Sequence, residues 1–347
     1  MKIEIDSRPR LAVAIGTLAV ALMAAIALAV PNRAHAAEKF SFLTNWYAEA
    51  EHGGFYQALA SGLYARAGLD VTIRMGGPQV NGLQLLAAGQ ADCLMGYDVQ
   101  IIKAHERGID AVTVAAAFQK DPLAMIGHPE TVRRMQDLAG KTILISSDAH
   151  TNYWPWLRST YGLDDAQLRP YTFSIQPFLA DRNTVQQGYV TSEPYAIRKA
   201  AGFEPTVLLL ADHGWPPYAM TVVCMRQTLE RRPAQVAAFV KASMLGWKAY
   251  LQRGPDGRAA RAAADALVKR DNPAMTDDLL AYGVEQIVTR GLVQGGDAAT
   301  LGIGIVSDER MKKTYDLLVA LKLVDPAKVD LRKTYTTRFV QGLGIRP

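Results

Sequence analysis

Residues 42–71 of this chain read FLTNWYAEAEHGGFYQALASGLYARAGLDV, and this stretch decides the fold. An apolar strand is followed by a loop of aromatic and polar residues, then by a helix with one apolar stripe. A second strand comes next, in which Leu69, Val71 and Ile73 alternate with polar residues. Open α/β sheets hold small ligands just past the carboxyl ends of their strands. The loop at 44–52 is therefore the first place where we expect a binding site.

Strands and helices alternate on both sides of this stretch. The apolar stripe of the first helix contains Phe55, Ala58, Leu59, Gly62 and Leu63, and Gly68 ends the helix. The pattern also predicts strands at 40–43, 91–96, 111–118, 142–146 and 219–226, and helices at 78–88, 99–107, 233–252 and 258–269. Such alternation predicts an α/β fold with mainly parallel sheets flanked by helices.

Two of the predicted strands divide the chain into two lobes. Residues 121–128 look like a strand that leaves the first lobe, and residues 219–226 look like a strand that returns to it. We expect lobe 1 to contain 37–125 and 221–347, and lobe 2 to contain 126–220. Two crossing strands between two lobes form a hinge.

The first 36 residues have the features of a secretory signal. Lys2, Arg8 and Arg10 precede an apolar run, Pro31 breaks the run, and the cleavage pattern Ala34-His35-Ala36 follows. We expect cleavage after Ala36 and a periplasmic protein. The alternative is an uncleaved anchor, because about 20 apolar residues can span a bilayer.

Charge and cysteine usage exclude some classes of protein. The formal net charge is +5, and the leader carries four basic and two acidic residues of the total, so no nucleic-acid-binding surface is indicated. The two cysteines, Cys93 and Cys224, lie in apolar strand-like runs with no metal-ligand spacing. Buried free thiols are the favoured interpretation. A disulfide would require the two strands to be neighbours, which the topology allows.

Several short motifs point to a known family. They are Asn45-Trp46, His52, Gly62-Leu63-Tyr64, Leu86 to Asp92 (LAAGQAD) and Ser192-Glu193-Pro194. Over residues 40–250 the chain resembles the periplasmic solute-binding proteins of ABC importers. The branch that it resembles binds thiamine pyrimidine precursors and is related to the binding proteins for sulfonates and taurine. The resemblance implies a two-lobed type II periplasmic-binding-protein fold. It also implies a small-molecule ligand, an ABC permease partner in the inner membrane and a monomer.

The first lobe supplies five candidate ligand contacts. Trp46 and Tyr47 follow a strand, and an aromatic face stacks well on a flat heterocycle. Asn45 offers both a donor and an acceptor, and His52 opens the first helix. Tyr97 follows another strand. The alternative roles are core packing for the aromatic residues and capping for His52.

The second lobe supplies the other candidates: Ser147, Tyr153, Tyr189 and Glu193. The carboxylate of Glu193 suits an aminopyrimidine or an ammonium group and suits a sulfonate badly; its alternative role is a surface loop acid. Ser147 lies in a turn before a helix, where backbone N–H groups favour anions. Asp148 in the same turn would repel a phosphate, so we expect a polar group without phosphate there.

An enzyme of the same fold is the sharpest rival interpretation. The fungal thiamine pyrimidine synthase, which this chain resembles in fold, needs a lysine, a histidine four residues later and a cysteine-rich run. Here the corresponding positions hold Gly96, Gln100 and Trp215-Pro216-Pro217-Tyr218-Ala219. We therefore expect a binding protein without catalytic residues, cofactor or metal. Thiamine pyrimidine precursors lead the ligand classes; riboflavin-like heterocycles, aromatic acids and sulfonates or taurine follow. A sensory role for the same fold stays open.

Overall fold

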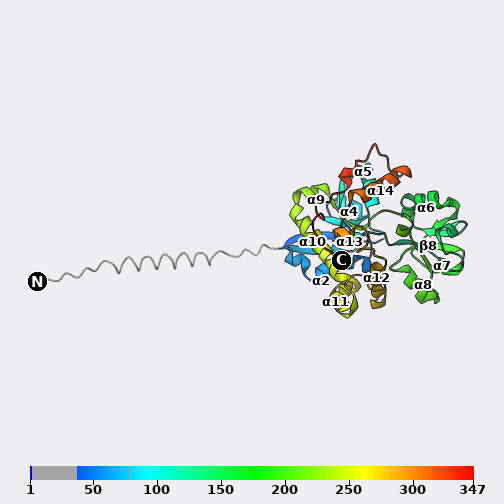
Figure 1. Cartoon of the computed structure of the whole chain (residues 1–347), viewed down its shortest axis with the longest axis horizontal. Helices are drawn as coiled ribbons and strands as arrows, with labels where there is room; N and C mark the ends of the chain where they lie inside the picture. The colour runs from blue at the N-terminus through cyan, green and yellow to red at the C-terminus, as the bar shows by residue number, and fades with distance from the viewer. Residues whose placement is uncertain (2–36, 78) are drawn as a thin grey trace. The chain divides into compact units, whose positions relative to one another are not determined.

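The structure, a computed structural model, describes residue 1, residues 37–77 and residues 79–347 (Figure 1). The predicted signal segment therefore lies, apart from Met1, outside the described residues. Within the described part of the chain, no helix combines the length and the apolar character that crossing a membrane requires.

The first sheet has five strands in the order β2-β1-β3-β10-β4. Its strands are β1 (Glu38–Leu43), β2 (Leu69–Arg74), β3 (Cys93–Gly96), β4 (Ala111–Phe118) and β10 (Ala219–Met225). β1 is parallel to β2 and β3, whereas β10 is antiparallel to both β3 and β4. Every residue of β4 is buried although β4 is an edge strand, because later parts of the chain lie along it and form isolated bridges from Tyr335 to Thr113 and from Gly304 to Ala116.

The second sheet also has five strands, in the order β7-β6-β8-β5-β9. They are β5 (Leu123–Gly127), β6 (Thr142–Ile145), β7 (Leu168–Pro170), β8 (Thr184–Tyr189) and β9 (Thr206–Leu209). β6 is parallel to β7 and β8, and β5 is antiparallel to β8 and β9. In each sheet, the strand that runs against the others is the one that follows a passage from the other sheet. The prediction of an α/β fold with two sheets is confirmed; each sheet is mixed, with two parallel and two antiparallel strand pairs.

Helices flank the sheets, and those around β8 belong to the second lobe (Figure 1). The first lobe contains α2 (Gly53–Ala60), α3 (Leu63–Arg66), α4 (Gly82–Ala87), α5 (Asp98–Glu106), α9 (Arg226–Arg231), α10 (Pro233–Tyr250), α11 (Gly254–Asp271), α12 (Asp277–Thr289), α13 (Ala298–Leu301), α14 (Asp308–Ala320) and α15 (Leu331–Thr334). The second lobe contains α6 (Trp154–Tyr161), α7 (Gln176–Ala180) and α8 (Glu193–Ala201). Short 3-10 turns are η1 (Ala50–His52), η2 (Met135–Leu138), η3 (Ser147–Thr151), η4 (Asp165–Gln167) and η5 (Leu210–His213).

Close packing of α2 on α10 fixes the start of the first lobe. A Cβ atom on Gly246 would lie 2.2 Å from the carbonyl oxygen of Gly54, so the two helices meet at glycines. Phe42 of β1 packs against Phe55 of α2 and Phe239 of α10, with ring centroids 4.6 and 4.9 Å away. This aromatic core holds the carboxyl end of β1, and with it the loop that follows, in one place.

The first helix is shorter than its apolar stripe predicts. It ends at Ala60, and Gly62 adopts φ 70° before the chain resumes as α3. Only glycine takes this left-handed conformation at little cost, so Gly62 interrupts the helix instead of extending the stripe. The helix predicted at 78–88 also begins later, at Gly82. There the side chain of Asn81 accepts a hydrogen bond from the backbone N–H of Gln84.

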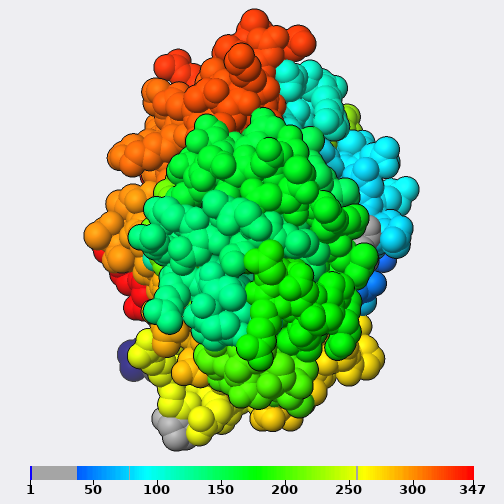
Figure 2. All heavy atoms as spheres, turned by 90° about the vertical axis from the view of Figure 1, so that its right-hand side faces the viewer, coloured from blue at the N-terminus to red at the C-terminus, as the bar shows by residue number. Residues whose placement is uncertain are grey.

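The chain passes between the two sheets at residues 119–122 and 214–218, which we call the crossing segments. They are joined to each other, because the indole Nε1 of Trp215 donates to Asp121 Oδ2 over 3.3 Å. By sheet membership both passages lie a few residues before the lobe boundaries expected at 125 and 220. The boundaries of the lobes as compact units stay a prediction. Figure 2 shows the second lobe, in green, as one continuous face.

A disulfide joins Cys93 to Cys224. The residues face each other across the antiparallel pair of β3 and β10. The favoured expectation of two buried free thiols is therefore wrong. It failed because the sequence does not show that β10 returns to insert between β3 and β4.

Candidate functional site

The loop after β1 is shaped by its own polar contacts. Thr44 Oγ1 donates to the carbonyl oxygen of Trp46 over 2.8 Å and accepts from the N–H of Gly76 at 3.1 Å. A Cβ atom on Gly76 would lie 2.3 Å from the carbonyl oxygen of Thr44, so only glycine permits this approach. The loops after β1 and β2 are thus held together, with Asn45 and Trp46 at the carboxyl ends of the strands.

A chain of hydrogen bonds runs from His52 to Tyr97. The backbone N–H of Glu49 donates to His52 Nδ1 at 3.3 Å, and His52 Nε2 lies 3.2 Å from Asn45 Oδ1. Asn45 Nδ2 in turn donates to the Tyr97 hydroxyl at 3.2 Å. Burial lowers the pKa of His52 to about 3. The neutral ring accepts at Nδ1 and donates at Nε2, so His52 orients Asn45 from inside the protein.

Tyr97 meets Tyr189 from the other lobe. Tyr97 lies just before α5 and Tyr189 ends β8, and the two hydroxyl groups are hydrogen-bonded to each other. Burial is the main cause that raises the pKa of both phenols well above the usual value. Both side chains therefore stay neutral and keep O–H donors at the junction of the lobes.

An aromatic cluster also spans the two lobes. The ring of Trp46 lies 5.0 Å from that of Phe173 and 5.5 Å from that of Tyr47. Phe173 in turn lies 5.3 Å from Tyr171. Phe173 is 53% exposed and has φ 60°, a backbone conformation that bulky residues rarely adopt. Strain at an exposed aromatic residue fits a side chain held in place to contact a ligand.

The carboxylate of Glu193 is bound within its own lobe. Oε2 accepts from the backbone N–H of Tyr189 at 2.7 Å and from the hydroxyl of Ser192 at 2.6 Å, and Oε1 accepts from the hydroxyl of Tyr171 at 3.2 Å. Glu193 therefore ties the end of β8 to the start of α8 and positions the tyrosines.

Two further candidates of the second lobe lie at the end of β6. Tyr153 is buried, and its hydroxyl donates to Gln187 Oε1 at 2.8 Å; the same oxygen accepts from the backbone N–H of Ser146. Ser147 is exposed at the start of η3. The structure thus brings Asn45, Trp46, Tyr47, His52, Tyr97, Tyr189 and Glu193 into one connected set. Tyr153 instead bonds to Gln187, and Ser147 is exposed.

Two buried acids in the loop after β1 were not among the predicted site residues. Glu49 is 9% exposed and Glu51 1% exposed. The Thr191 hydroxyl, from the second lobe, donates to Glu51 Oε1. Burial raises the pKa of Glu51 to about 7 and that of Glu49 well above its usual value. The only signal in the sequence was the spacing of two acids beside His52, which does not distinguish buried from exposed carboxylates.

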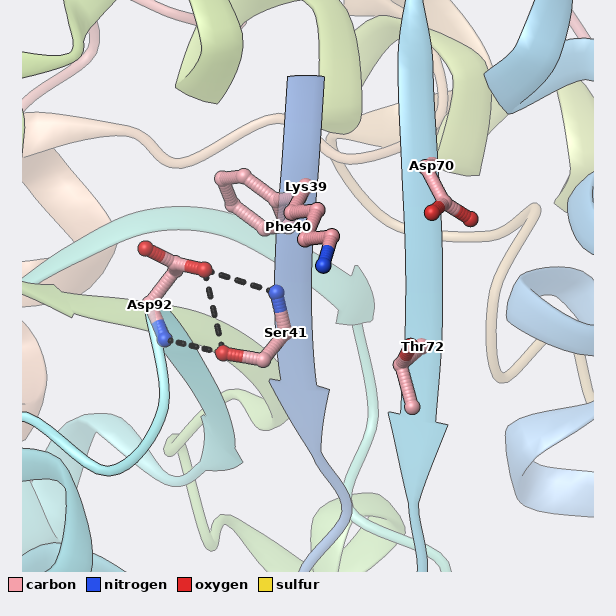
Figure 3. Close-up of a pocket in the computed structure, with 6 residues that line it drawn as sticks. All are labelled: Lys39, Phe40, Ser41, Asp70, Thr72 and Asp92. Carbon is pink, nitrogen blue, oxygen red and sulfur yellow. Dashed lines mark hydrogen bonds between the residues drawn. The ribbon is translucent and has the colours of Figure 1, made fainter. Parts of the chain in front are cut away.

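A hollow of about 400 Å³ lies elsewhere, over β1 and β2 (Figure 3). Its lining contains none of the predicted site residues. Asp92 in its wall is already bonded to the backbone N–H and hydroxyl of Ser41, at 2.7 and 3.0 Å, and to Arg232. Since this carboxylate is paired within the protein, we place the candidate site at the junction of the lobes. No group of three or more His, Cys, Asp or Glu in the described ranges could hold a metal ion.

Comparison with known proteins defines the class. The fold matches the periplasmic aliphatic sulphonate binding protein of Escherichia coli with a TM-score of 0.63 at 17% identity, over 85% of this chain and 91% of the other. It also matches the alkanesulfonate-binding protein of Xanthomonas axonopodis pv. citri bound to MOPS, with a TM-score of 0.61 at 14% identity, over 86% and 98%. The chain has the fold of periplasmic solute-binding proteins.

Its family follows from the sequence. Residues 49–256 match the family described as NMT1/THI5 like, and the chain belongs to that family. A curated relative, the formylaminopyrimidine-binding protein of Halalkalibacterium halodurans, is 23% identical over 246 residues, which are 69% of this chain and 74% of the relative. The resemblance stated from the motifs is confirmed.

Proposed function

We propose that this protein is the substrate-binding component of an ABC importer. It captures a small, flat, polar molecule between its lobes in the periplasm and presents it to a permease in the inner membrane. The observation that carries the proposal is the meeting of Asn45, Trp46 and Tyr97 from one lobe with Tyr189 and Phe173 from the other. Binding proteins of this fold close about a hinge on a ligand held at such a junction.

The ligand class that we favour is a nitrogen-rich heterocycle of the thiamine pyrimidine precursor type. Aromatic faces on both lobes suit a flat ring. The buried carboxylates of Glu49 and Glu51 suit ligand N–H groups and oppose a sulfonate. The name of the curated relative agrees with this choice, whereas the names of the two solved structures agree with the sulfonate alternative.

The chain does not support the chemistry of the synthase that shares its fold. Gly96, at the position expected to hold the lysine, ends β3, and a Cβ atom there would lie 3.0 Å from Gln100 Oε1 and 3.2 Å from Val223. A lysine would have to displace both neighbours. We therefore propose binding without turnover, and incubation with pyridoxal phosphate and borohydride should label no single lysine.

Calorimetry on the protein lacking residues 1–36 tests the ligand class. The probes are a formylaminopyrimidine, the ligand class in the name of the relative, taurine and benzoate. We expect one pyrimidine molecule to bind per chain, more tightly than either acid. Binding of taurine alone would keep the transport role and overturn the pyrimidine assignment. A stoichiometric pyridoxal phosphate adduct would overturn the binding role itself.

A further inference from the structure

One carboxylate oxygen at the junction of the lobes accepts no hydrogen bond from the described residues. Glu49 is nine-tenths buried, and among the described residues no donor reaches its Oε1 atom. Buried polar atoms are almost always hydrogen-bonded, because leaving one unpaired costs about 1–3 kcal/mol. Such an exception at a candidate binding site points to a partner that comes from outside the protein.

The neighbouring acids are already engaged. Glu51 accepts from Thr191, and Glu193 accepts from the backbone of Tyr189 and from the hydroxyls of Ser192 and Tyr171. Glu49 is therefore the carboxylate of this group that keeps a free acceptor. Glu49 lies in the same loop as Asn45, its backbone N–H donates to His52 Nδ1, and its charge adds to the burial that raises the pKa of Tyr97 and Tyr189.

A small cavity of about 10 Å³, about the size of one water molecule, adjoins Glu49. It is lined by residues of both lobes: Glu49, Ala50, Glu51, Thr191, Ser192, Met275 and Leu279. The cavity is too small for a ring. It has room for the tip of a polar substituent.

The electrostatics decide which substituent fits. Burial raises the pKa of Glu49, and the negative charges of Glu51 and Glu193 raise it further, so the ionised form of Glu49 is disfavoured until a hydrogen-bond donor or a cation offsets its charge. A ligand carboxylate or sulfonate would add to the repulsion among these acids, and the ionised form of Glu49 would have no hydrogen to donate to a ligand carbonyl. An amino or ammonium N–H would relieve it and form a charge-assisted hydrogen bond.

We propose that Glu49 is the specificity-determining residue of the site and accepts a hydrogen bond from an amino group on the ligand ring. This inference rests on the proposed function and adds the residue that would select amino-substituted heterocycles over their oxo counterparts. Glu193 then acts as a positioning residue.

A matched pair of probes tests the role of Glu49. The probes are 4-amino-5-hydroxymethyl-2-methylpyrimidine and its 4-oxo analogue, which replaces the N–H donor by an acceptor at the same ring position. Calorimetry should show that the wild-type protein prefers the amino probe by about tenfold or more, as expected for one charge-assisted hydrogen bond. Glu49→Gln should lose this preference, because its amide can also donate to the oxo group.

Controls separate specificity from folding. Glu230→Gln removes the same charge from the exposed surface of α9 and should bind both probes like the wild type. Thermal melting should show that Glu49→Gln stays folded. Glu193→Gln should weaken the binding of both probes without changing the ratio of their affinities.

The outcomes are distinct. If the wild type prefers the amino probe and Glu49→Gln keeps that preference, the inference is wrong and the proposed function stands. The inference is also wrong if Glu193→Gln alone removes the preference. If the wild type binds neither pyrimidine, the proposed ligand class fails and the role of Glu49 falls with it.

Discussion

Asn45 shows how residue type sets the geometry of the site. Its Oδ1 faces His52 and its Nδ2 faces Tyr97, so one amide uses an acceptor and a donor at once. Aspartate would lack the donor, and leucine would lack both. Because burial keeps His52 neutral, the direction of these hydrogen bonds is fixed before a ligand arrives.

Trp46→Ala should weaken binding of the pyrimidine probe by about tenfold, since an aromatic contact adds about 0.5–1.5 kcal/mol beyond the burial of its area. Trp46 is only half-buried, so the fold should persist. Calorimetry measures the affinity, and Trp46→Phe, which keeps an aromatic face, should retain most of it. Equal affinity in wild type and Trp46→Ala would show that the ring does not stack there.

Glu51→Gln should change how stability depends on pH. The pKa of Glu51 is raised to about 7 in the folded state, so its contribution to stability is present below the ordinary value of 4.5 and is lost as the pH rises through 7. The free energy of unfolding of the wild type should fall relative to that of the variant by up to about 1.4 kcal/mol per pH unit in this window. Urea denaturation at several pH values measures it. A difference in the free energy of unfolding that stays constant with pH would contradict the raised pKa of Glu51.

The predictable part of the site was the part that follows strands. Asn45, Trp46, Tyr97 and Tyr189 come at or just past strand ends, so their types and positions were enough to select them as candidates. Their contact with a ligand stays a prediction. Phe173 also follows a strand, but β7 has only three residues and gives little pattern. The free acceptor of Glu49 was not predictable, because it depends on what Thr191 and Ser192 do from a distant part of the chain.

At the scale of elements, β10 lies between β3 and β4 and joins β4 to the rest of the first sheet. It brings Cys224 opposite Cys93 across 131 residues of chain, a loop that contains the whole second sheet. The alternation of strands and helices predicted the elements well, and β4 begins and ends as expected, at Ala111 and Phe118. Strand order and the bridge were not predictable, because they depend on pairing between distant segments.

The double variant Cys93→Ala/Cys224→Ala should have a lower free energy of unfolding, by about 2–5 kcal/mol, because the bridge no longer restricts the unfolded chain. Chemical denaturation measures this difference. Under reducing conditions, the free energy of unfolding of the wild type should equal that of the variant. Two alkylatable thiols in denatured but unreduced protein from the periplasm would contradict the disulfide.

At the scale of the whole molecule, the two lobes touch through the residues that we assign to the ligand. Tyr97 bonds Tyr189, Trp46 packs on Phe173, and Glu51 accepts from Thr191. The crossing segments are tied together by Asp121 and Trp215. In the function that we propose, closure of the lobes would bring the two halves of the site together.

Export should remove the first 36 residues. The cleavage pattern at 34–36 predicts a mature chain that starts at or near Ala37. Mass spectrometry of a periplasmic extract measures the N-terminus. Recovery of the intact chain from membranes would favour the anchor alternative instead.

The most direct test of the central claim is a crystal structure with 4-amino-5-hydroxymethyl-2-methylpyrimidine bound. The account predicts the ring between Trp46 of one lobe and Tyr189 of the other, with its amino nitrogen within about 3.2 Å of Glu49 Oε1. A ligand found in the hollow over β1 and β2, or bound with its amino group away from Glu49, would contradict it.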